Sequence, residues 1–267
     1  MIVTVTFLAA ASLYALAGGL YLVFAARGAE EIAKWAARLL GAAVIAHLAF
    51  LGTDYAVAGN LPTADIRQTL SMTALLIAIA YLVALRRYRL SVLGAFITPV
   101  TLLLFLGAAF QRNVAAVPED VRSILLPIHV GVNILGIVAF ALAFAVALAY
   151  IIQERLLRKK QLGGLFQRLP PLDELDSLAF RLVTIGFPLL TVGIVTGAVV
   201  AARLGGDEAA LTASRLTALL AWLFFAGVLF LRVLAGWRGR RAAIGTMLGF
   251  LCAVVVLVGY VIRAETL

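Results

Sequence analysis

The sequence predicts an all-α fold, a helical bundle embedded in a membrane. Of the 267 residues, 64% are hydrophobic and only 13% are charged, and the mean hydropathy is +1.09. A soluble domain of this size is much less apolar. The apolar residues fall into runs that are each long enough, as helices, to cross a hydrocarbon core of about 30 Å. We therefore expect a single polytopic transmembrane domain over residues 1–267.

We expect eight transmembrane helices joined by short connections. Their approximate limits are 3–25, 38–58, 69–85, 90–110, 124–151, 179–202, 214–235 and 243–262. The first run is longer than a signal-peptide core and lacks a basic segment before it, which favours a retained span. The largest connection runs from Gln153 to Ser177 and is too short for a soluble domain. Within it, Pro170 and Pro171 predict an extended turn before a helix restarts at Leu172.

The basic residues are unevenly divided between alternate connections. Most of the 22 Lys and Arg residues fall in one set of connections. The remaining few are Arg67, Arg112, Arg122, Arg203, Arg215 and Arg263. Cytoplasmic connections are enriched in Lys and Arg, so the richer set is predicted to be cytoplasmic. An even number of spans then places both termini on the outer, periplasmic side of a bacterial inner membrane. Because the basic residues lie in short clusters, the net charge of +9 does not favour nucleic-acid binding.

Two histidines are the residues for which we predict chemistry. We expect His47 ~14 Å inside the cytoplasmic surface and His129 ~7 Å below the outer surface, judged from the helical rise. An unpaired imidazole is costly in hydrocarbon, and an ionisable side chain within a membrane indicates function. Two neutral imidazoles from different helices of a bundle can act as axial ligands of haem iron. We therefore predict a b-type haem as cofactor, with His47 and His129 as its iron ligands.

Several neighbouring residues are candidates for supporting this cofactor. Asn133, one helical turn beyond His129, is expected either to support that ligand or to bond across helices. Asp54, two turns beyond His47, is expected either to mark the end of its span or to orient a ligand. Haem propionates need cationic partners, and arginines on the outer side could provide them. The candidates are Arg67, Arg112, Arg122, Arg203 and Arg215. Gly193 and Gly197 form a GxxxG pattern, which allows another helix to approach closely.

Other chemistries agree less well with the sequence. A closed zinc site needs more ligands than two histidines, and a single cysteine, Cys252, excludes an internal disulfide or a CxxC site. A proton relay would need acids deep in the bilayer. No catalytic nucleophile, acid–base pair or nucleotide loop is visible, so we predict no enzyme in its own right. Electron transfer through a bound haem is compatible with two axial histidines. A transporter would favour repeated halves, and the sequence has no convincing internal repeat.

Three segments resemble the membrane core of the cytochrome c assembly superfamily, which includes CcsA, CcmC and HemX. They read HVGVNILGIVAFALAFAVALAYI, PPLDELDSLAFRLVTIGFPLLTVGIVTGAV and AWLFFAGVLFLRVLAGWRGRRAAIGTMLGFL. The resemblance covers about residues 125–262 and implies haem handling at the outer face of an energy-transducing membrane. Within it, His129 matches a histidine that the family associates with haem.

The chain also departs from CcsA and CcmC. The loop that follows IGFPLLTVGIVTGA reads RLGGDEAALTAS, without the tryptophan-rich WWD segment of those proteins. Phe230 stands near one position where CcsA-like proteins tend to have histidine, and RAETL stands at another. The sequence therefore resembles the shorter HemX- and YpjD-like branch more closely.

Two hypotheses follow from these observations. In the first, the protein binds haem b and serves haem handling or cytochrome c biogenesis, alone or with a protein partner of haem synthesis or cytochrome c maturation. In the second, it is a cofactor-free membrane regulator or scaffold, linked to tetrapyrrole synthesis, that binds a partner protein through its cytoplasmic loops.

Overall fold

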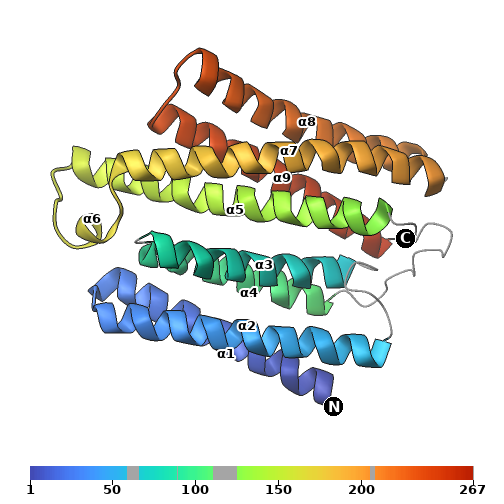
Figure 1. Cartoon of the computed structure of the whole chain (residues 1–267), viewed down its shortest axis with the longest axis horizontal. Helices are drawn as coiled ribbons and strands as arrows, with labels where there is room; N and C mark the ends of the chain where they lie inside the picture. The colour runs from blue at the N-terminus through green and yellow to red at the C-terminus, as the bar shows by residue number, and fades with distance from the viewer. Residues whose placement is uncertain (59–65, 89, 111–124, 205–207, 267) are drawn as a thin grey trace. The chain divides into compact units, whose positions relative to one another are not determined.

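The computed structural model describes residues 1–58, 66–88, 90–110, 125–204 and 208–266. Every regular element in these ranges is helical, which confirms the predicted fold class for this part of the chain (Figure 1). The elements are α1 (Ile2–Arg27), α2 (Glu30–Ala58), α3 (Ile66–Arg87), the 3-10 turn η1 (Ser91–Leu93), α4 (Gly94–Phe110), α5 (Leu125–Arg158), α6 (Leu165–Arg168), α7 (Leu172–Leu204), α8 (Glu208–Leu234) and α9 (Arg240–Thr266).

Within the described residues, six helical segments are long and apolar enough to cross a membrane, namely α1, α2, α3, α4 together with the η1 turn, α5 and α7. In α8 the stretch Ala218–Leu234 is apolar but shorter. Helices suit this environment because a bilayer core holds no water to bond free backbone N–H and C=O groups. The chain is therefore a multi-span membrane protein. The eight spans and the outward orientation of both termini remain predictions.

Helices α5 and α7 are longer than the apolar runs that predict them. We expect spans at 124–151 and 179–202, whereas α5 continues to Arg158 and α7 begins at Leu172. Polar side chains support the extension of α5, since Gln153 donates to the Phe166 carbonyl over 3.3 Å and Arg158 donates to Glu154 over 2.8 Å. The connection between these helices is correspondingly shorter than predicted. Helix α8 likewise begins at Glu208 rather than near 214.

The chain divides into two compact units, which are described separately. Unit 1 comprises Met1–Phe110 and Ile152–Leu172, and unit 2 comprises Gln111–Ile151 and Asp173–Leu267. The single domain expected from the sequence remains a prediction.

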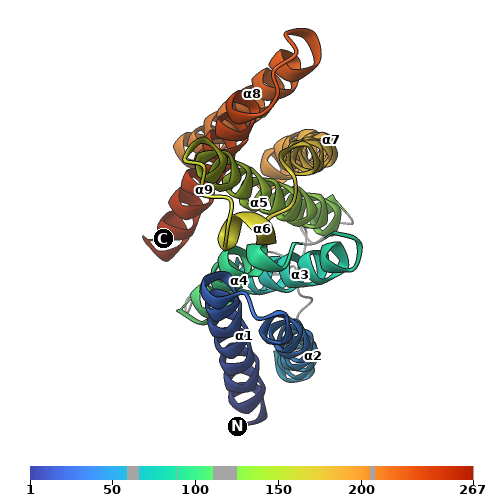
Figure 2. The ribbon, with the colours of Figure 1, turned by 90° about the vertical axis from the view of Figure 1, so that its left-hand side faces the viewer.

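Unit 1 is built around α1 to α4. These helices lie side by side in Figures 1 and 2, and α1 packs against both α2 and α4. The largest buried side chains in the unit are Tyr14, Tyr21, Tyr81, Phe24 and Phe105. Gly94, the first residue of α4, makes this packing possible, because a Cβ there would lie 2.5 Å from the ring of Tyr21.

The end of α1 is joined to the segment between α5 and α7. Gly28 ends α1 in the left-handed region, with φ 75°, and its N–H donates to the Phe24 carbonyl. Arg168 of α6 donates through Nη1 to the Ala25 carbonyl over 2.8 Å and to the Phe24 carbonyl over 3.3 Å. These bonds satisfy carbonyls that a helix end otherwise leaves unpaired. A Cβ at Gly28 would overlap the Arg168 guanidinium.

Unit 2 has an apolar core and a charged clamp. Phe140 of α5 stacks on Phe225 of α8, with ring centroids 3.8 Å apart. In the clamp, Arg232 of α8 binds Asp176 of α7 through two bonds of 2.9 and 2.7 Å, and the Gly239 N–H donates to the same carboxylate over 2.9 Å. The clamp therefore joins α7, the end of α8 and the turn that leads into α9.

Candidate functional site

His47 lies at the centre of unit 1, where both of its ring nitrogens have partners. Its side chain is fully buried. Nδ1 lies 3.1 Å from the hydroxyl of Tyr14 in α1, and Nε2 lies 2.8 Å from the hydroxyl of Ser71 in α3. The ring of Phe105, in α4, packs 4.1 Å from the imidazole, centroid to centroid. Hydrogen bonds to both nitrogens compensate the cost of burying a polar ring.

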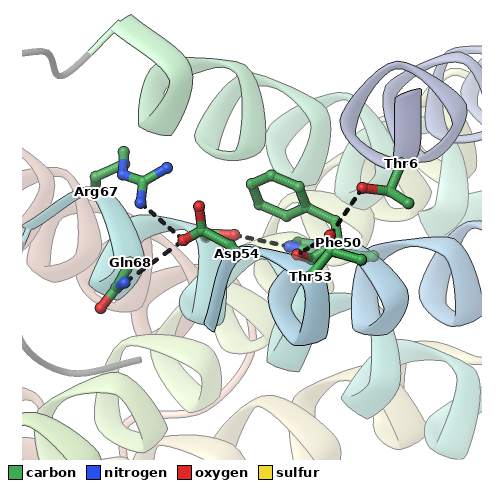
Figure 3. Close-up of polar contacts among 8 residues, drawn as sticks. Thr6, Phe50, Thr53, Asp54, Arg67 and Gln68 are labelled. Carbon is green, nitrogen blue, oxygen red and sulfur yellow. Dashed lines mark hydrogen bonds and ion pairs between the residues drawn. The ribbon is translucent and has the colours of Figure 1, made fainter. Parts of the chain in front are cut away.

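Asp54 and Arg67 form an ion pair in the same unit (Figure 3). Arg67 Nη2 donates to Asp54 Oδ2 over 2.7 Å, and Gln68 Nε2 points to the same oxygen at 3.5 Å. The Asp54 side chain is 11% exposed and that of Arg67 29%. Nearby, the hydroxyl of Thr53 in α2 lies 3.1 Å from that of Thr6 in α1. The Asp54 carboxylate near the end of α2 is therefore neutralised by Arg67 near the start of α3.

His129 lies in unit 2, in the second turn of α5, and its ring faces α7. Its side chain is partly buried. Nδ1 lies 3.0 Å from the Gly193 carbonyl and 3.1 Å from the Thr196 hydroxyl. On the α5 side, Asn133 Nδ2 donates to the His129 carbonyl over 2.7 Å. The same amide nitrogen lies 3.2 Å from Nδ1 and 3.4 Å from Nε2. Of the two ring nitrogens, Nε2 therefore has the weaker contacts within the described residues.

The two glycines of the GxxxG pattern in α7 lie directly against the side chains of His129 and Asn133. A Cβ at Gly193 would overlap the Asn133 amide, and a Cβ at Gly197 would lie 2.6 Å from Cε1 of His129. One turn deeper, a Cβ at Gly136 of α5 would meet α7 at ordinary contact distance. The expectation that these glycines admit another helix closely is confirmed, and the approaching helix is α5.

The structure brings together some of the predicted site residues. Asn133 supports His129, and Arg67 is bonded to Asp54. Arg215 lies exposed in α8. Arg203 belongs to α7, although its side chain is outside the described part of the structure, and Arg112 and Arg122 lie outside the described residues altogether. His47 and His129 belong to different units, so their pairing remains a prediction.

Three residues next to the histidines were not predicted from the sequence. Tyr14 and Ser71 are 33 and 24 residues from His47 along the chain, and no local pattern links them to it. Thr196 did have a local signal, because it is a hydroxyl residue inside the GxxxG pattern, directly before Gly197.

These features define a class of protein, a multi-span helical membrane protein whose long helices carry histidines set among polar partners. The chain belongs to the cytochrome c assembly protein family, whose family model matches residues 63–264. That match contains His129, Asn133 and the α7 glycines, whereas α1 and α2, including His47, precede it entirely.

Similar proteins carry the name cytochrome c biogenesis protein CcsA. The protein from Parasynechococcus marenigrum (strain WH8102) is 29% identical over 227 residues, 75% of this chain and 74% of the relative. That from Gloeothece citriformis (strain PCC 7424) is 27% identical over 261 residues, 79% of each chain. That from Prochlorococcus marinus (strain MIT 9301) is 28% identical over 234 residues, 77% of this chain and 74% of the relative. These relatives do not support the HemX-like branch, which remains a prediction.

Proposed function

We propose that this protein binds haem and acts in cytochrome c biogenesis. Membership of the cytochrome c assembly family and the name of the CcsA relatives support the proposal at the level of the process. The chain is a multi-span membrane protein, which suits a haem-handling role at a membrane surface. We further propose that it has eight spans with both termini outward in a bacterial inner membrane.

The environment of His129 is the observation that carries the proposal. The histidine lies within the part of the chain that the family model matches, and its ring is only partly buried. Nδ1 has two oxygen partners at 3.0 and 3.1 Å, whereas Nε2 has only a long 3.4 Å contact to the Asn133 amide among the described residues. A neutral imidazole nitrogen with a weak partner suits haem iron, which histidine binds without adding charge. His129 therefore fits an axial ligand, and Asn133 supports it.

We retain His47 as the second axial ligand and haem b as the haem type. For His47 to bind iron, the bond to Tyr14 or the bond to Ser71 would have to be replaced, since both ring nitrogens are engaged. Bound haem would supply an iron centre able to change its oxidation state. Of the five outer arginines, we propose Arg215 as a propionate partner, because it is exposed and lies in the same unit as His129, whereas Arg67 neutralises Asp54.

The absorption spectrum of the detergent-purified protein tests this function. We expect wild-type protein from haem-replete cells to show a six-coordinate, low-spin haem spectrum. His129→Ala should lose it, and His47→Ala should lose it if that residue is the second ligand. Gly131→Ala is a matched control in α5, because a Cβ at Gly131 meets nothing within 4 Å. This variant should keep the wild-type spectrum.

Each other outcome has a defined meaning. A colourless wild-type preparation would contradict haem binding and favour a cofactor-free scaffold whose loops bind a partner protein. Colour retained in His129→Ala would contradict His129 as a ligand. Colour lost in His129→Ala but kept in His47→Ala would leave His129 as a ligand and assign the second position to another residue.

A further inference from the structure

We infer that α7 sets the tautomer of His129. The Gly193 carbonyl and the Thr196 hydroxyl hold the ring proton on Nδ1, so that Nε2 presents its lone pair as the ligand atom. The role of Nε2 as a ligand atom depends on the proposed haem binding. The tautomer itself depends only on contacts within unit 2. In this inference Thr196 is a positioning residue.

The Gly193 carbonyl decides where the proton lies. A carbonyl oxygen can only accept a hydrogen bond, so the 3.0 Å contact with Nδ1 requires an N–H at that nitrogen. A neutral imidazole carries one ring proton, and Nε2 is then the acceptor. Ligating histidines commonly donate their other ring N–H to a backbone carbonyl or a carboxylate, which fixes the tautomer and raises the basicity of the ligand.

Thr196 adds a second acceptor on the same side of the ring. Its hydroxyl lies within reach of two carbonyls of α7, at 2.7 Å from Val192 and 3.1 Å from Gly193, and it donates its own hydrogen there. Its oxygen is therefore left to accept from Nδ1 at 3.1 Å. The Nδ1 proton is shared between two oxygens that both belong to α7.

The position of the Asn133 amide agrees with this tautomer. The amide makes only a weak contact with Nε2. One of its amide hydrogens goes to the His129 carbonyl over 2.7 Å. The other cannot bond to Nδ1, because that nitrogen already carries a proton, so it is directed toward Nε2 at 3.4 Å. An iron ion at Nε2 would replace the weakest contact of the cluster and leave the Nδ1 bonds intact.

Nitrogen-15 NMR of histidine-labelled protein without haem tests the tautomer directly. The chain has two histidines, so two sets of ring signals are expected, and loss of one set in His129→Gln or in His47→Gln assigns both. At a pH where the ring is neutral, we expect His129 to show a protonated Nδ1 and an unprotonated Nε2. A protonated Nε2, or rapid exchange between the two tautomers, would overturn the inference whether or not the protein binds haem.

Substitution of Thr196 tests its role as a positioning residue. Thr196→Val should increase the fraction of His129 with its proton on Nε2, weaken haem binding about tenfold and move the midpoint potential of bound haem to more positive values. Thr196→Ser, which keeps the hydroxyl, should restore the wild-type values. Thr246→Val is the matched control, because Thr246 also donates to the carbonyl four residues earlier, over 3.0 Å, in α9.

The two measurements separate the inference from the proposed function. The expected tautomer in a protein that never takes up haem would contradict the proposed function and leave the arrangement of the ring established. Haem binding through His129 with an unchanged tautomer and potential in Thr196→Val would contradict the role of Thr196. Equal effects of Thr196→Val and Thr246→Val on tautomer and potential would show a general loss of packing and contradict it as well.

Discussion

Gly197 of α7 lies directly against the imidazole of His129, so close that a Cβ at this position would be 2.6 Å from Cε1. Real side chains essentially never approach so closely, and the ring therefore depends on a residue without a side chain. The contact explains why a polar residue of α5 reaches the α7 backbone at a GxxxG pattern, where helices approach closely.

Replacing Gly197 with Ala should displace the His129 ring and weaken its bond to the Gly193 carbonyl. We expect at least a tenfold loss of haem affinity, as is common when an outer-shell partner of a ligand is disturbed. The haem content per protein, measured by absorbance during haem titration, checks this. Gly131→Ala is the control, because a Cβ there meets open space. Equal haem affinity in both variants would contradict the role of Gly197.

Replacing Tyr14 with Phe should destabilise unit 1. The hydroxyl of Tyr14 lies 3.1 Å from Nδ1 of His47, and both residues are fully buried. A buried ring nitrogen left without its partner costs about 1–3 kcal/mol. Thermal unfolding in detergent measures the loss. Tyr55→Phe removes a hydroxyl from a side chain that is 51% exposed and should change little. Equal melting temperatures for the two variants would show that the bond to His47 adds no stability.

Replacing Arg67 with Ala should leave the Asp54 carboxylate without its closest cationic partner. The pair is partly exposed, so we expect a loss of about 2 kcal/mol, within the range of hydrogen bonds to charged groups. Haem content should stay unchanged, because Arg67 forms its ion pair with Asp54 and not with a haem propionate. Arg86→Ala removes an exposed charge of α3 and is the control for stability. Loss of haem at unchanged stability would instead assign Arg67 to a propionate.

Replacing Asp176 with Ala should strongly destabilise unit 2. The Arg232 side chain, which is 11% exposed, would keep its charge and lose a two-bond partner 2.7 to 2.9 Å away. Breaking one side of a fully buried pair costs about 3–5 kcal/mol, and because this pair is only partly buried we expect a loss of about 3 kcal/mol. Denaturation of the variant beside Arg241→Ala, which removes an exposed charge, measures the effect. A melting curve that matches the control would contradict the clamp.

Replacing Gly28 with Ala should release the segment between α5 and α7 from α1. The new Cβ would overlap the Arg168 guanidinium, and the left-handed conformation at φ 75° disfavours alanine. We expect faster tryptic cleavage at the exposed Lys159 and Lys160, followed by mass spectrometry. Arg168→Ala should reproduce the effect, and Gly19→Ala, where a Cβ meets open space, should not. Unchanged cleavage in both test variants would exclude this link.

The sequence predicted the features that depend on local pattern. Apolar runs located the helices, because a backbone within a bilayer has to satisfy its own hydrogen bonds. The restart of α7 at Leu172 followed from Pro170 and Pro171. Polar extensions such as Gln153 to Arg158 were missed, because they are held helical by partners outside the apolar run.

The sequence by itself determined that this is a helical membrane protein, that His47 and His129 belong to its apolar helices, and that Gly193 and Gly197 admit a neighbouring helix. Tertiary structure alone decided what each histidine contacts. His47 is bonded by Tyr14 and Ser71, whereas His129 rests on α7 with its Nε2 weakly bonded. The physical reason is that hydropathy and helical spacing describe one segment at a time. The hydrogen-bond partners of a buried imidazole come from other helices, many residues away, and packing selects them.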